Sequence, residues 1–248
     1  MNKLVVFFII TFLMSGSVLA EKIRFSTSAT NPPFEFINKN NQLAGIDIDL
    51  AKALCIQMQA ECTFTNQAFD SLIPALKFRK YDAVISSLDI TAERSKQVTF
   101  SDPYYENSAS VIAKKSSYRT LADFNGKRIG VENGSTHQKY LQGKYPEIKT
   151  VAYDSYLNAF TDLKNGRTEG VFGDTAAVNE YLKTNPRLYM VTKKITDPDY
   201  FGAGLGIAVN HENPELIYKI NKALQAIRSD GTYNEIIDKW EPEQNINN

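Results

Sequence analysis

Two stretches of the chain repeat one pattern: residues 76–85 read LKFRKYDAVI and residues 163–172 read LKNGRTEGVF, with matching positions 87 residues apart. In each copy we expect the end of a helix, a tight turn and a buried strand. The turns would span Arg79–Tyr81 in the first copy and Asn165–Thr168 in the second. Each half of the chain is therefore predicted to contain the same helix, turn and strand unit. Apolar strands resemble one another, so chance similarity is the alternative.

Polar residues follow both repeated strands. The first ends in Ser86 and Ser87, and the second ends in Gly173 and Asp174. In open α/β sheets, ligands bind outside the carboxyl ends of the strands. The repeat therefore directs one strand end from each half of the chain toward a common site.

Strand-like and helix-like segments alternate around the repeat, which favours an α/β fold with parallel βαβ units. The expected strands of the first half are Lys22–Ser26, Thr63–Thr65 and Ala83–Ser86, and its expected helices are Ile48–Met58 and Phe69–Lys80. In the second half we expect a strand at Arg128–Val131, a loop at Glu132–Thr136 and a helix from about His137 to Gln142. No long Pro, Gly or Ser linker divides the halves. The chain is predicted to cross between them near Tyr105–Val111 and to return near Gly204–Ile207, and two crossings make a hinge.

The first 20 residues have the pattern of a cleavable secretory signal peptide. Lys3 precedes the apolar run Leu4–Met14, and a stretch of small residues ends at Ala20, after which we expect cleavage. An uncleaved anchor is the alternative, but the run is shorter than the roughly 20 residues that cross a bilayer. Export predicts an oxidising compartment. Cys55 and Cys62 are therefore expected to form a disulfide, with two buried free thiols as the alternative.

The charge balance excludes some partners. Removing Lys3 with the signal leaves 27 basic and 28 acidic residues, so the chain has no basic footprint for nucleic acid or for an anionic membrane surface. The two histidines, His137 and His211, lie far from the cysteines in the sequence, and no zinc-like spacing is present. We expect no metal, no cofactor and a monomer.

Several long motifs resemble one known family. The stretches Gly45–Leu54, Asp82–Arg94, Phe100–Tyr105 and Ser229–Tyr233 are similar to the polar amino-acid-binding proteins of the bacterial periplasm. The resemblance covers essentially the whole mature chain. It implies the type II periplasmic binding protein fold, in which each of two lobes has a βαβ sheet and two hinge crossovers join them. The implied division is a signal peptide at 1–20, a first lobe at 21–109 and 205–248, and a second lobe at 110–204.

Within that family, Asn133–Gln138 and Tyr200–Gly206 look most like the arginine-binding members. The resemblance implies a periplasmic component of an ABC importer that binds L-arginine and delivers it to a membrane permease. A broader specificity for lysine, ornithine and histidine is an alternative. A dehydratase-like enzyme on the same fold is another, but it would need a general acid and base, and no nucleophile pair or phosphate-loop pattern is evident. The sensing lobe of a receptor is a third.

The resemblance also implies residues that would hold the ends of an amino acid. Arg94 aligns with the arginine that grips the α-carboxylate, as a planar guanidinium fork suits; a solvated surface charge is the alternative. Thr136 would contact the same carboxylate from the start of a helix, beside Ser135, although such hydroxyl residues often only cap the helix. Asp174 and Asp89 would accept bonds from the α-ammonium.

The family's pattern implies further lining residues. Ser87, with Ser86 before it, would complete the ammonium site through its carbonyl, and Phe69 would stack on the ligand's side chain unless it is core filler. Asp47 and Glu35 are candidates to pair with a guanidinium, although Asp47 could instead be a helix N-cap.

Two positions depart from the relatives. Asn31 stands where relatives usually have an aromatic second wall, so Phe34 is considered as a substitute. Ser28 stands where some lysine- and histidine-binding relatives have an aspartate, which weakens those specificities.

Overall fold

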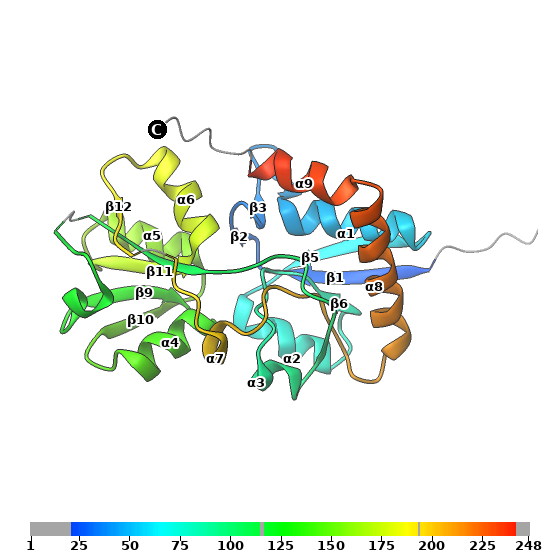
Figure 1. Cartoon of the computed structure of the whole chain (residues 1–248), viewed down its shortest axis with the longest axis horizontal. Coiled ribbons are helices and arrows are strands. Elements are labelled where there is room, and N and C mark those ends of the chain that lie inside the picture. The colour runs from blue at the N-terminus through cyan, green and yellow to red at the C-terminus, as the bar shows by residue number, and fades with distance from the viewer. Residues whose placement is uncertain (1–20, 115–116, 193, 242–248) are drawn as a thin grey trace, which may run out of the picture.

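Two five-stranded sheets form the framework of the protein in the computed structural model, which describes residues 21–114, 117–192 and 194–241. The expected signal peptide lies outside the described residues. Figure 1 shows the sheets side by side along the long axis of the molecule, each with its own helices. We call the part built on the first sheet the first lobe and the part built on the second sheet the second lobe.

The first sheet has the order β5-β1-β6-β13-β7. Its strands are β1 (Lys22–Thr27), β5 (Glu61–Asn66), β6 (Ala83–Val84), β7 (Thr99–Phe100) and β13 (Ala208–Val209). Strand β1 pairs in parallel with β5 and β6, and β13 is antiparallel to β6 and β7. A small antiparallel sheet of β2 (Thr30–Asn31), β3 (Glu35–Ile37) and β4 (Leu43–Ala44) packs beside it against helix α1.

The second sheet has the order β10-β9-β11-β8-β12. Its strands are β8 (Ala109–Ala113), β9 (Arg128–Glu132), β10 (Lys149–Tyr153), β11 (Gly170–Asp174) and β12 (Tyr189–Met190). Strand β9 pairs in parallel with β10 and β11, whereas β8 is antiparallel to β11 and β12. Both sheets therefore have a parallel core and antiparallel strands toward one edge.

Helices cover both sheets. In the first lobe they are α1 (Ile46–Gln57), α2 (Leu72–Lys77), α3 (Ala92–Ser95), α8 (Pro214–Ser229) and α9 (Thr232–Trp240), with a 3-10 turn η1 at Phe69–Ser71. In the second lobe they are α4 (Thr136–Lys144), α5 (Tyr156–Lys164), α6 (Thr175–Thr184) and α7 (Pro198–Phe201), with η2 at Leu121–Phe124. Helices α1, α8 and α9 pack together on one side of the first sheet (Figure 1). None of the helices in the described ranges combines the length and the apolarity needed to span a membrane.

The repeated unit is confirmed in detail. Arg79 and Gly166, 87 residues apart, both have left-handed backbones, with φ of 56° and 74°. Their N–H groups donate to the carbonyls of Leu76 and Leu163, each at 3.0 Å. These bonds end α2 and α5 in the same way, because a left-handed residue after a helix lets its last carbonyls be satisfied. In both copies a strand that pairs in parallel with its neighbour follows the turn.

The two crossovers lie where the strands change sheet. The chain passes from β7 to β8 through Tyr105, and returns from β12 to β13 through Leu205. These two residues pair with each other in an isolated bridge, and Leu205 also bridges to Asp89. The two hinge segments therefore lie side by side next to a predicted site residue.

Some expected elements are shorter or longer than the sequence predicted. The expected helix at Phe69–Lys80 begins as the 3-10 turn η1 and ends at Lys77, because Arg79 adopts the left-handed conformation that terminates it. The strand expected at Ala83–Ser86 is confined to Ala83–Val84. Helix α4 extends beyond the expected His137–Gln142 at both ends. The expected disulfide is confirmed: Cys55 in α1 is bonded to Cys62 in β5, with Cα atoms 6.2 Å apart.

Candidate functional site

Arg94 is the buried cation at the junction of the lobes. Its side chain is only 6% exposed, although α3 is a short surface helix capped by the side chain of Thr91. One guanidinium nitrogen donates to the carbonyl of Asp89 at 3.1 Å, and the other to the carbonyl of Gly134, in the second lobe, at 3.3 Å. The alternative of a solvated surface charge is therefore wrong for Arg94. Burial lowers its pKa, and the charges of Asp89 and Asp174 oppose that shift.

Asp89 and Asp174 lie close together although they come from different lobes. The side-chain amide of Asn107, in the first hinge segment, donates to both carboxylates, at 2.9 Å to Asp89 and 2.6 Å to Asp174. The two carboxylate oxygens are therefore no more than 5.5 Å apart. Burial raises the pKa of each carboxyl to about 6, and for Asp89 the charge of Asp174 adds to that effect.

Each of these carboxylates also accepts a bond from the opposite lobe. Thr136, the first residue of α4, donates its hydroxyl to Asp89 at 2.5 Å. Asn31 of β2 donates to Asp174 at 2.8 Å, and its side-chain oxygen is buried with no hydrogen-bond partner among the described residues. The structure thus brings together four predicted residues, Asp89, Thr136, Asn31 and Asp174. Ser135 has the expected capping role, because its hydroxyl accepts from the N–H of Gln138 at 3.1 Å.

Glu35 and Asp47 form a second buried acidic group beside Ser87. Ser87 has φ of 39°, which is rare for a residue other than glycine. Its N–H donates to Asp47 at 2.7 Å and its hydroxyl to Glu35 at 2.9 Å, while the hydroxyl of Ser86 also donates to Glu35, at 3.2 Å. The two acids therefore hold the turn that follows β6. Burial raises the pKa of Asp47 to about 6 and that of Glu35 well above its usual range.

The alternative interpretation of Asp47 as an N-cap is wrong. The N-cap of α1 is Gly45, and Asp47 lies inside the first turn of the helix with no exposed surface. Its carboxylate oxygens both accept from the hydroxyl of Tyr104, at 2.9 and 3.0 Å. Asp47 is therefore fully engaged within the first lobe.

The aromatic predictions separate into two cases. Phe69 packs in the buried cluster with Leu72 and Val84, and the guanidinium of Arg94 lies 5.4 Å from its ring centroid. Its stacking on a ligand stays a prediction. Phe34 has no exposed surface and packs edge-on against Tyr105 in the first-lobe core, so it offers no face to the junction of the lobes.

Ser28 is buried, and its N–H donates to the hydroxyl of Ser86 at 2.9 Å.

A model of the bacterial extracellular solute-binding proteins, family 3, matches residues 23–243 of the chain. The chain belongs to this family. This solute-binding protein is 67% identical over 243 residues to ABC transporter arginine-binding protein 1 of Escherichia coli strain K12. The alignment covers 98% of this chain and 100% of the relative.

Solved structures of other binding proteins share the fold of this chain. A Salmonella typhimurium periplasmic binding protein, described for its high arginine specificity, matches with a TM-score of 0.87 at 54% identity, covering 89% of this chain and 99% of that chain. An ancestral amino acid-binding protein, described as a precursor of cyclohexadienyl dehydratase, matches with a TM-score of 0.80 at 31% identity, covering 88% of this chain and 95% of that chain. The two-lobed α/β fold expected from the sequence is therefore confirmed.

Sequence reasoning missed several residues of the junction. Asn107 bridges the two aspartates from the hinge, and Tyr104 holds Asp47. Glu132, at the end of β9, is buried and accepts from the hydroxyl of Thr30 at 3.1 Å. The position of Glu132 at the carboxyl end of a strand was a usable signal, whereas Asn107 and Tyr104 have no such pattern around them.

His137 lies buried in α4 of the second lobe, close to Asp174. Its Nδ1 shares a hydrogen bond of 2.9 Å with the hydroxyl of Tyr156, and its Nε2 lies 3.5 Å from Asp174 without forming a hydrogen bond. Burial lowers the pKa of His137 to about 4. The described residues contain no group of three or more acids, histidines or cysteines arranged to hold a metal ion.

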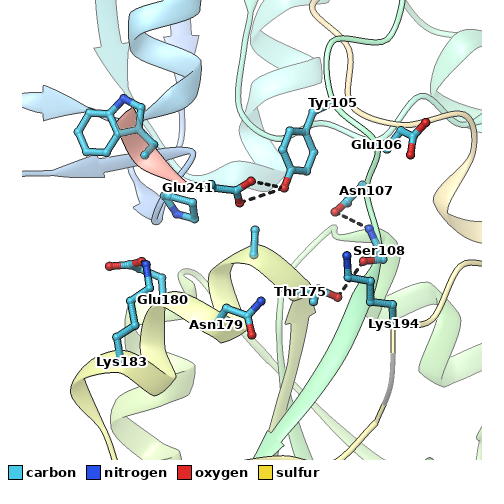
Figure 2. A pocket seen from close by; sticks show the side chains of 13 residues that line it. Tyr105, Glu106, Asn107, Ser108, Thr175, Asn179, Glu180, Lys183, Lys194 and Glu241 are labelled. Carbon is cyan, nitrogen blue, oxygen red and sulfur yellow. Dashed lines mark hydrogen bonds and ion pairs between the residues drawn. The ribbon is translucent and has the colours of Figure 1, made fainter. Parts of the chain in front are cut away.

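A separate cavity of about 230 Å³ lies beside the first hinge segment. Figure 2 shows Tyr105 donating to the carboxylate of Glu241, and Ser108 donating to Thr175 at the start of α6. Of the junction residues described above, this cavity is lined by Tyr105 and Asn107 alone. It is therefore distinct from the group of buried acids, although Asn107 borders both.

The buried acids predict an unusual pH dependence of stability in the ligand-free protein. The pKa is raised to about 6 for Asp47, Asp89 and Asp174 and to about 8 for Glu132, in each case chiefly by burial. Between the usual carboxyl pKa near 4 and these values, the folded protein holds protons that the unfolded chain releases. The free energy of unfolding therefore falls as pH rises from about 5 to 8, because these carboxyl groups outnumber His137, whose lowered pKa acts in the opposite direction below about pH 6.5.

Urea unfolding midpoints across that range measure the slope. Glu132→Gln cannot release a proton, so the variant is expected to have a shallower slope between about pH 6 and 8, with Glu35 retaining its own contribution. A wild-type midpoint that rises steadily from pH 5 to 8 contradicts the prediction.

Proposed function

We propose that this solute-binding protein is the periplasmic arginine-binding component of an ABC importer, which captures L-arginine by lobe closure and delivers it to the membrane permease. The observation that carries the proposal is the charge of the lobe junction. Five acids are buried among the described residues, Glu35, Asp47, Asp89, Glu132 and Asp174, and Arg94 is the one lysine or arginine buried there. A desolvated site in which acids outnumber cations favours a ligand that supplies positive charge. The names of the relatives support the same ligand.

The α-carboxylate is assigned to Arg94 and the start of α4. A guanidinium has five N–H donors, and two nitrogens of Arg94 each make one bond, to Asp89 and Gly134. Three donors therefore remain for a planar carboxylate. Thr136 and the N–H groups at the start of the helix would complete its binding.

The α-ammonium is assigned to Asp174 and Asp89, next to Ser87. Two ionised carboxylates with oxygens no more than 5.5 Å apart repel each other by at least about 3 kcal/mol at an effective dielectric constant near 20. A cation between them removes that repulsion. Phe69 is assigned to the ligand's side chain, together with Ser28, Asn31, Ser86 and Ser135 as lining residues.

Lobe closure follows from the origin of these groups. Arg94 and Asp89 belong to the first lobe and Thr136 and Asp174 to the second, so a ligand that contacts all four stabilises the closed arrangement through its differential contacts. Lobe boundaries at 21–109, 110–204 and 205–248 are part of this proposal. Asp70 accepts from Asn133 at 2.8 Å and Glu93 pairs with Lys139 at 2.5 Å, which adds contacts between the lobes at the side of Arg94.

The remaining features of the proposal concern export and chemistry. The first 20 residues would direct export and be cleaved after Ala20. The ligand would be released unchanged: the relatives are binding proteins, and the titratable groups of the junction are assigned to holding the ligand. A broader set of basic amino acids is the competing specificity.

Calorimetric titration with arginine, lysine, ornithine, histidine and glutamine tests the specificity. Arginine is expected to bind more tightly than each other ligand by roughly tenfold or more, a difference of about 1.4 kcal/mol. Equal affinity for lysine or ornithine would instead support the broader specificity. Glutamine as the tightest ligand would sink the proposal.

Arg94→Ala tests the carboxylate assignment. Removing one member of a buried charge pair costs at least about 2 kcal/mol, so the variant is expected to bind arginine roughly 30-fold more weakly or worse. Arg119→Ala, at an exposed position of the second lobe, is the matched control and should retain wild-type affinity. Near-normal affinity of the Arg94 variant overturns the assignment.

A further inference from the structure

Glu132 is the last residue of β9, at the carboxyl end of an interior strand of the second sheet. The residue is 3% exposed. Its carboxylate accepts from the hydroxyl of Thr30, in β2 of the first lobe, at 3.1 Å. Glu132 therefore faces across the junction of the lobes rather than into its own lobe.

Within the described part of the chain, no lysine or arginine forms an ion pair with Glu132 or with Glu35. Burial raises the pKa of Glu132 to about 8, with Asp174 and Asp70 adding to the shift and Thr30 and Arg94 opposing it. Ionising a buried acid that has no paired cation costs free energy. A ligand cation placed beside Glu132 would therefore stabilise its ionised form.

The other two acids that the sequence offered for this role are less suited to it. Asp47 has both oxygens on the hydroxyl of Tyr104, and one also accepts from the N–H of Ser87. Glu35 uses one oxygen to hold Ser86 and Ser87, and its other oxygen is buried with no partner among the described residues. Both acids stabilise the turn after β6. The carboxylate of Glu132 accepts one side-chain hydrogen bond, from the neutral hydroxyl of Thr30, and does not stabilise this turn.

We propose that Glu132 is the specificity-determining residue that pairs with the guanidinium of bound arginine. This inference rests on the proposed function and adds a contact from the second lobe. Because Thr30 and Glu132 approach each other across the junction, the pairing forms only when the lobes are closed. A positively charged side chain of the ligand then stabilises the closed state by pairing with Glu132. A neutral side chain cannot form this ion pair.

Citrulline is the sharpest probe, because a urea group replaces the guanidinium of arginine with the same shape and no charge. Wild-type protein is expected to prefer arginine strongly. In Glu132→Gln the ratio of arginine to citrulline affinity should fall by roughly 30-fold or more, the smallest loss expected for one member of a buried charge pair. Glu147→Gln, an exposed acid of the same lobe, is the matched control and should leave the ratio unchanged.

The outcomes separate the two hypotheses. Equal losses for both ligands in Glu132→Gln would mean a structural role and would overturn the inference, as would a selective loss in Glu35→Gln with none at Glu132. A wild-type protein that binds neither arginine nor another basic amino acid would instead overturn the proposed function.

A second measurement keeps the test informative if Glu132→Gln folds poorly. Glu132 must be ionised to pair with a guanidinium, so wild-type protein should release a fraction of a proton at pH 7 when arginine binds, and less when citrulline binds. Titrations in buffers of different ionisation enthalpy measure this release. Equal proton release for the two ligands contradicts the inference.

Discussion

Buried carboxyl groups that outnumber the buried guanidinium are the constraint on which the junction of the lobes depends. Asp89 and Asp174 share one amide hydrogen-bond donor, Asn107, and cannot both carry full charge there without strong repulsion. Burial of both carboxyl groups raises their pKa values. The junction therefore holds protons and internal hydrogen bonds at this position, and in the proposed function a ligand cation replaces the protons.

The fold places these charges by using one unit twice. Helices α2 and α5 end at left-handed residues 87 positions apart, and each turn leads into a strand whose far end reaches the junction. The first unit leads to Ser87 and Asp89, and the second leads to Asp174. The hinge segment that carries Asn107 passes between them. In the proposed function, the segments that carry Asp89, Asn107 and Asp174 therefore serve both lobe closure and recognition of the ligand's charge.

The sequence predicted the repeated unit, the two crossings and the disulfide, because turn chemistry and hydrophobic periodicity are local signals. It also brought Asp89, Thr136, Asn31 and Asp174 to one place through family motifs. The length of the helix at Phe69–Lys80 was wrong because Arg79, a residue with no general left-handed preference, ends it. Asn107 and Tyr104 were missed because their role depends on partners far away in the sequence. Glu132 was placed only in a loop, and its burial against Thr30 depends on how the lobes meet.

A crystal structure of the solute-binding protein with bound arginine would show all three proposed contacts at once. We expect a closed form in which the α-carboxylate lies on Arg94 and Thr136, the α-ammonium lies between Asp89 and Asp174, and the guanidinium lies within hydrogen-bond distance of Glu132. Arginine bound in the reverse orientation, with its guanidinium between Asp89 and Asp174, would overturn these assignments. So would a ligand held outside this group of buried acids.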